Sequence, residues 1–306
     1  MKVYKGFTKD LKCRNFQYEI GGEYEEKEAE LCKNGFHACE YPLDCFNYYR
    51  PADSRFCEVD VCDVSTLKSN DTKICGRKIK IGAEIGIPGL VKAAIEYVSE
   101  KADPSNKNHT TANQKSNSAT GYGSANSATG YGSANSATGD KSANSATGDM
   151  SANSATGYGS ANSATGDGSA NSATGYWSAN SATGDRSANS ATGDWSANSA
   201  TGDRSANSAT GDKSANSATG YGSANLSTGV NCTNNGVGQR NISIGWGKDN
   251  KCKGSIGSFL VLSEWEKWDG EKYPFKNAAM VEVDGEKIKE DTYYMLVNGE
   301  IVEVEE

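Results

Sequence analysis

The chain has 306 residues, a net charge of −8 and nine cysteines. Its length allows about two domains. No apolar run approaches the ~20 residues of a membrane-spanning helix, and the first residues carry no apolar signal segment, so we expect a cytoplasmic protein with reduced thiols and no membrane partner. The negative charge is concentrated in residues 259–306, which hold 13 acidic residues and 5 lysines, and this acidity argues against nucleic-acid binding.

Residues 1–104 predict an α/β head. Residues 2–7, 56–64 and 78–85 have the pattern of strands, and the middle segment alternates apolar and acidic side chains. A helix is expected to begin near Pro88 and to end before Pro104. The acidic segment 23–32 fits either a helix or a solvated turn.

Four residues of the head are candidate metal ligands: Cys32, His37, Cys39 and Cys45. Three thiolates and one imidazole are a ligand set that zinc accepts in structural sites. Their spacing lacks the two-residue separation of a zinc knuckle, so the sequence favours buried, apolar thiols over a metal site. We therefore expect no metal and no cofactor.

A catalytic pair in the head is an alternative. His37 and Cys39 are two residues apart, so on a strand their side chains share one face, and His37 would act as the base for Cys39 or Cys13. The sequence shows neither a third, orienting group nor a pocket. An enzyme is therefore the second hypothesis, and a protein without catalytic activity is the first.

A linker or first cap at residues 105–114 leads into twelve uninterrupted nine-residue units, which span residues 115–222. The consensus unit is Ser-Ala-Asn-Ser-Ala-Thr-Gly followed by two variable residues, and all twelve units keep Ser-Ala-Thr-Gly. A fixed short period is typical of a stacked solenoid. A coil of one unit would have a perimeter of only about 30 Å at ~3.3 Å per residue, too small to hold side chains. We therefore predict a β-solenoid of 18 residues per coil, with two short parallel strands in each coil.

The side chains of this unit are nearly all small, and alternation places them on two faces. We predict that Ala179, Ser181 and their equivalents point inward, with Asn180 stacked or exposed. The open ends of the stack need caps. The head is expected to supply one cap, and degenerate coils at residues 223–257, followed by a strand at 258–263, supply the other.

The two variable residues of each unit form the predicted binding surface. With two units per coil, Trp177, Trp195 and Lys213 fall on one edge, and Arg186 and Arg204 on the opposite edge. The candidate binding residues are Tyr176, Trp177, Arg186, Trp195, Arg204 and Lys213. The alternatives are ice or carbohydrate binding by the repeat, or a scaffold whose aromatic residues merely cover corners.

The acidic tail, residues 258–306, carries two hairpin dipeptides. Asp284-Gly285 and Asn298-Gly299 each lie between alternating segments, as in hairpins with type I′ turns. We predict a small antiparallel β-hairpin module.

Both ends of the chain resemble a known protein family. The segments MKVYKGF and GFHACEYPLD of the head, and VDGEKIKEDTYY and GEIVEVE of the tail, are similar to those of proteins from phages, prophages and Firmicutes, in which such ends flank tandem Ala/Ser/Thr/Gly-rich repeats. The resemblance implies a phage or prophage origin and supplies no catalytic residues. We therefore expect a structural or binding protein in the bacterial cytoplasm. It would present its repeats to a protein partner or to further copies of itself, and would block or sequester a host factor.

Overall fold

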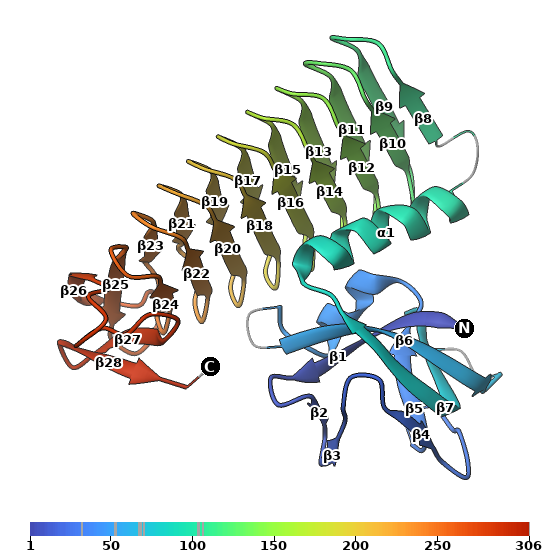
Figure 1. Ribbon diagram of the computed structural model, residues 1–306, viewed down its shortest axis with the longest axis horizontal. Coiled ribbons are helices and arrows are strands. Elements are labelled where there is room, and N and C mark those ends of the chain that lie inside the picture. The colour runs from blue at the N-terminus through green and yellow to red at the C-terminus, as the bar shows by residue number, and fades with distance from the viewer. Residues whose placement is uncertain are drawn as a thin grey trace.

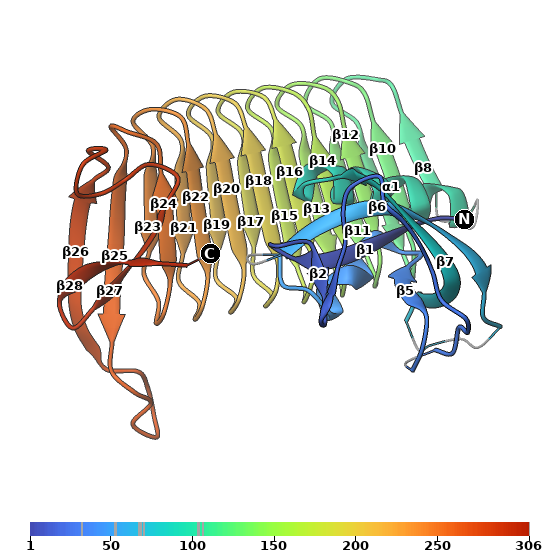
Figure 2. The ribbon, with the colours of Figure 1, turned by 60° about the horizontal axis from the view of Figure 1, so that its bottom comes forward.

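A computed structural model describes residues 1–31, 33–51, 54–66, 69, 71–102, 105 and 107–305. Its main feature is a long β-solenoid (Figures 1 and 2). The head lies against one side of this solenoid, and the tail extends its carboxyl-terminal end.

The head is a small antiparallel barrel followed by a helix. Its sheet has the order β4-β7-β5-β1-β6, and a further β6–β7 pairing closes it. The elements are β1 (Lys2–Thr8), β2 (Lys12–Cys13), β3 (Phe16–Gln17), β4 (Glu23–Glu25), β5 (Phe36–Cys39), the 3₁₀ helix η1 (Pro42–Asn47), β6 (Ser54–Val64), β7 (Lys73–Glu84) and α1 (Ile87–Lys101). Alternation along β1 and β6 directs Val3, Phe7 and Val59 into the barrel core.

The solenoid consists of two parallel sheets, which we call the even sheet and the odd sheet. The even sheet contains β8 (Lys107–Thr110), β10 (Ala125–Ala128), β12 (Ala143–Ala146), β14 (Ala161–Ala164), β16 (Ala179–Thr183), β18 (Ala197–Thr201), β20 (Ala215–Thr219), β22 (Thr233–Val237) and β24 (Lys251–Gly254). The odd sheet contains β9 (Ser116–Thr120), β11 (Ala134–Thr138), β13 (Ala152–Thr156), β15 (Ala170–Thr174), β17 (Ala188–Ala191), β19 (Ala206–Ala209), β21 (Ala224–Ser227), β23 (Ile242–Gly245) and β25 (Phe259–Trp265).

The strand register confirms the predicted coil of two units. Ala161 pairs with Ala179, and Asn162 with Asn180, so equivalent residues of neighbouring coils are 18 positions apart. The same register continues into the degenerate coils, where Ala224 pairs with Ile242.

The predicted inward face was wrong. Ser178, Asn180 and Ala182 point into the solenoid, whereas the equivalents of Ala179 and Ser181 on the odd sheet, such as Ala188 and Ser190, point outward. The reason is hydrogen bonding, because asparagine can pair along the solenoid axis and alanine cannot.

Buried asparagine ladders occupy the interior of both sheets. Asn162 Nδ2 donates to Asn180 Oδ1 at 3.0 Å and to the Ser172 carbonyl, in the opposite sheet, at 2.6 Å. Each asparagine thus joins its own sheet along the axis and ties the two sheets together. In a core with little apolar bulk, this satisfied polar network replaces much of the usual hydrophobic packing.

The corners are set by two backbone requirements. A Cβ added to the seventh residue of a unit would overlap the coil before it: at Gly148 it would lie 2.3 Å from the Gly130 carbonyl oxygen. The ninth residue instead takes a left-handed conformation, as Arg186 does with a φ of 57°. Glycine therefore appears in every unit at position seven because neighbouring coils approach closely there.

The head does not cap the end of the solenoid, as predicted from the sequence, but lies along its flank. Helix α1 crosses the outer face of the even sheet from β10 to β18 (Figure 1). Its 15 residues span about 22 Å, close to the ~19 Å between the first and last of those five strands. The physical reason is that the apolar stripe of α1 finds a matching column of alanines on this face.

The tail continues both sheets in antiparallel fashion. Strands β26 (Phe275–Glu282), β27 (Tyr293–Val297) and β28 (Glu300–Val304) pair with β25, with β24 and with β27, respectively. The hairpin at Asn298-Gly299 is confirmed, with φ angles of 52° and 81°. The hairpin at Asp284-Gly285 was wrong, because Asp284 Oδ1 accepts three backbone N–H groups and forms a capped loop instead.

Candidate binding surfaces

The variable residues lie on two opposite edges, as the two-unit coil requires. The head-facing edge, where odd strands turn into even strands, holds Trp177, Trp195 and Lys213, together with Tyr176. The far edge, where even strands turn into odd strands, holds Arg186 and Arg204.

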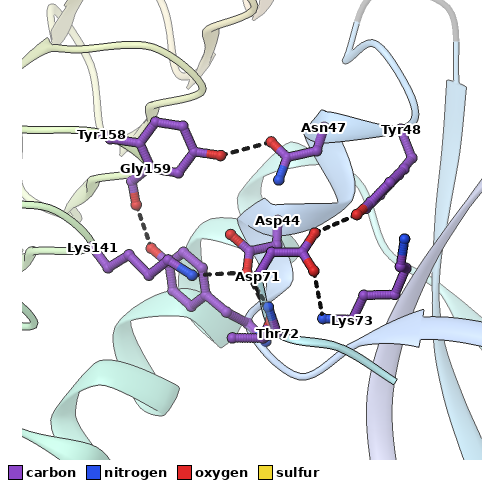
Figure 3. Close-up of polar contacts among 10 residues, drawn as sticks. Asp44, Asn47, Tyr48, Asp71, Thr72, Lys73, Lys141, Tyr158 and Gly159 are labelled. Carbon is purple, nitrogen blue, oxygen red and sulfur yellow. Dashed lines mark hydrogen bonds and ion pairs between the residues drawn. The ribbon is translucent and has the colours of Figure 1, made fainter. Parts of the chain in front are cut away.

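On the head-facing edge, polar side chains join the solenoid to the head (Figure 3). Lys141 Nζ lies 2.7 Å from Asp44 Oδ2, and Asp44 is only 1% exposed. The Tyr158 hydroxyl donates to Asn47 Oδ1 at 2.7 Å. The Tyr41 hydroxyl donates to the Gly159 carbonyl. These variable residues hold the head in place.

Both tryptophans of the array also lie at this junction. Trp177 packs edge-on against Tyr158 at 4.6 Å and borders the apolar cluster shared by the head and the solenoid. The Arg50 guanidinium of the head lies 5.3 Å from the ring centroid of Trp195, with Lys213 Nζ at 5.0 Å. Tyr176 projects into solvent, with 58% of its surface exposed.

The far edge is exposed and faces away from the head. Arg186 and Arg204 are exposed there, one coil apart. The aspartates beside them have a structural role, because Asp185 Oδ1 accepts the backbone N–H of Asp203 at 2.8 Å. Whether these arginines bind a partner stays a prediction.

Sequence reasoning missed a groove on the outer face of the odd sheet. Its volume is about 880 Å³, and it runs from β9 to β23. The groove is lined by two columns of small residues, an alanine column that includes Ala152, Ala170 and Ala188, and a serine column that includes Ser154 and Ser172.

The outer face of the even sheet has the same residues in the same order, and there α1 covers it. Leu90, Val91, Ala94 and Val98 of the helix are buried in one cluster with the even-sheet alanine column. That column comprises Ala125, Ala143, Ala161, Ala179 and Ala197. One face of the repeat is thus covered by a helix, while its odd-sheet equivalent is open. The sequence held one signal of this groove, the outward-pointing alanine of the repeat. The coil itself does not require an apolar side chain at that position.

His37 and three of the head cysteines gather around a separate cavity. His37, Cys39, Cys45 and Cys13 line this cavity of about 770 Å³. A hydrogen bond that the Cys39 thiol donates to Cys45, together with burial, raises the pKa of Cys39, the opposite of what a nucleophilic thiolate needs. Burial, with nearby Lys5, Lys73 and Arg14, lowers the pKa of His37.

The proposed metal ligands do not form a complete set among the described residues. Cys32 lies outside them, and the described part of the chain contains no group of three or more His, Cys, Asp or Glu side chains arranged to hold a metal ion. Within that same part, no helix has the length and apolarity needed to cross a membrane.

Comparison with known proteins identifies the head alone. Residues 1–93 match a family described as a domain of unknown function (DUF7666). The match covers the barrel and the first turns of α1, and it stops before the repeats. No match was found among curated proteins or among solved structures.

Proposed function

We propose that this is a non-enzymatic binding protein whose repeat array holds an amphipathic helix of a partner protein in the groove of the odd sheet. The observation that carries the proposal is the pair of equivalent faces. On the even sheet, the alanine column and α1 exclude water from each other. On the odd sheet, the equivalent alanines are exposed along an open groove.

The geometry of the groove supports a rod-shaped occupant. The seven strands from β9 to β21 are separated by six steps of ~4.8 Å, so together they span about 29 Å. A helix of roughly 19 residues has this length. Small alanine and serine side chains allow a helix to approach closely, and branched residues such as those of α1 fill the space between coils. A concave groove also suits a helix better than the flat surface of an ice crystal.

The partner's origin is part of the same proposal. The two ends of the chain resemble phage and prophage proteins, so the partner is a bacterial host protein in the cytoplasm. Sequestering its helix would block it. The exposed arginines of the far edge would border the bound partner and add contacts there.

A helical peptide of the chain's own sequence tests this proposal. The probe is residues 86–102, stapled across Lys92 and Glu96, which are four residues apart and exposed in α1. The full chain should bind one equivalent of the peptide, because its even sheet is already occupied. Ala170→Glu places a charge in the groove and should weaken binding by about tenfold or more.

Thr174→Glu is the matched control, since Thr174 lies on the same strand but outside the groove. Equal weakening by both substitutions would contradict the proposal. So would the absence of binding up to about 1 mM peptide, which corresponds to less than about 4 kcal/mol of affinity.

A further inference from the structure

The interior of the head barrel contains a lysine where an apolar residue is expected. Lys5 alternates with Val3 and Phe7 on β1, and both neighbours are buried in the barrel core. Lys5 itself is only 4% exposed. Burying an ammonium group is costly unless a counter-ion compensates it.

No carboxylate among the described residues lies within ion-pair distance of this ammonium group. Lys5 Nζ donates to the His37 carbonyl at 2.8 Å and lies 3.6 Å from Cys13 Sγ. It also lies 5.4 and 5.8 Å from the ring centroids of Phe7 and Tyr18. These contacts orient the ammonium group without neutralising its charge.

The cavity beside Lys5 gathers further positive charge. Arg14, Lys33 and Lys73 line it together with Lys5, against one acidic lining residue, Glu26. Lys33 is already paired with Glu30. Burial is the main cause of the lowered pKa of His37, and Lys5, Lys73 and Arg14 lower it further. Lys73 has the Asp71 carboxylate nearby, since its backbone N–H donates to Asp71 Oδ1 at 3.1 Å. Lys5 and Arg14 are therefore the cavity cations that most need an anion.

Aromatic rings form the other part of the wall. Phe16, Tyr18, Tyr48 and Tyr49 line the cavity, and Phe16 and Tyr48 are 43% and 45% exposed. Exposed rings beside a positive wall suit a ligand with a planar ring and a negative group. The volume of about 770 Å³ lies in the range of small-molecule sites.

We infer that the head cavity binds a nucleoside phosphate, with the phosphate held by Lys5, Arg14 and Lys73 and the base stacked on the aromatic wall. This site is independent of the solenoid groove. It requires no phosphate-binding glycine motif, because side chains supply the positive charge.

Calorimetric titration of the full chain tests the inference. The probes are adenosine monophosphate, guanosine monophosphate, adenosine and inorganic phosphate. A monophosphate should bind measurably more tightly than adenosine or phosphate alone. Lys5→Met, which fits the apolar barrel interior, and Arg14→Gln at the rim should each lower that affinity by about tenfold.

Lys80→Met is the matched control, because Lys80 also lies on a barrel strand but is exposed and paired with Glu23. The imidazole pKa of His37, followed by NMR, should rise when the monophosphate binds. The inference is overturned if phosphate alone binds as tightly as the monophosphates, if none of the probes binds, or if Lys5→Met and Arg14→Gln leave the affinity unchanged.

Discussion

The Lys141 ammonium group and the Asp44 carboxylate meet at 2.7 Å although 97 residues separate them in the chain. Asp44 also accepts hydrogen bonds from the backbone and the hydroxyl of Thr72, at 3.0 and 2.7 Å. Both charges are nearly buried between the head and the solenoid. The ninth residue of one repeat unit is therefore an anchor for the head.

Replacing Lys141 with methionine leaves Asp44 buried without its counter-ion. We expect the free energy of unfolding to fall by about 3–5 kcal/mol, as for other broken buried ion pairs. Urea denaturation followed by circular dichroism measures the change. Arg204→Met, at a ninth position on the exposed far edge, should change stability by no more than about 0.5 kcal/mol. Equal losses in the two variants would remove the anchoring role of Lys141.

The asparagine ladder gives a second prediction. Asn153 accepts from Asn135 at 2.9 Å and donates to Asn171 at 2.9 Å and to the Ser163 carbonyl at 2.7 Å. Asn153→Ala leaves these buried partners unsatisfied, and we expect a loss of about 2–3 kcal/mol. Ser154→Ala, one residue on and pointing outward, should be nearly neutral. A neutral Asn153→Ala would show that the ladder contributes little to stability.

The period of the repeat was sufficient to predict the coil, but not its inward face. Eighteen residues per coil follow from the perimeter, because nine residues leave no interior. Hydrophobicity does not show whether Ala179 or Asn180 points into the solenoid, because both alternating faces of the strand hold only small residues. It is decided by hydrogen bonds along the axis, which only the asparagine makes over successive coils.

The candidate sites were harder to predict, because they depend on contacts between distant segments. The two tryptophans were placed on one edge correctly, yet no local pattern shows that Arg50 of the head reaches Trp195. The groove was missed because its alanine and serine columns were predicted to point inward. Lys5 was only a weak signal of the head cavity, as a charged residue that alternates with Val3 and Phe7 along its strand.

The seventh glycine of each unit gives a third prediction. At Gly148, an added Cβ would lie 2.3 Å from the Gly130 carbonyl oxygen and would force two coils apart. We expect Gly148→Ala to lower the thermal midpoint by several degrees, the effect of a loss of roughly 1–3 kcal/mol from overpacking. Gly168→Ala is the matched control. Its φ of 65° is costly for alanine, but other units hold a side chain at this ninth position and the added Cβ would meet only Met150, at 3.7 Å, so we expect a smaller fall in the midpoint. Equal midpoints in the two variants would contradict this account of the invariant glycine.

The final prediction concerns alkaline pH and Cys252, which is buried at the asparagine position of β24. Burial raises the pKa of this thiol to about 12 from an ordinary value of 9.0. Between about pH 9 and 12, the native state therefore keeps the thiol proton, whereas the unfolded chain has lost it. The resulting stabilisation is complete below pH 9 and is lost between about pH 9 and 12, with a slope of about 1.4 kcal/mol per pH unit.

Urea midpoints of the native chain and of Cys252→Ala, measured at intervals from pH 8 to 11, give the test. The buried tyrosines also titrate at high pH, but they are common to both proteins, so the difference between the two curves isolates the thiol. The stability advantage of the native chain over the variant should shrink as pH rises above about 9. A constant difference across that range would mean that the Cys252 thiol ionises in the native state as readily as in the unfolded chain.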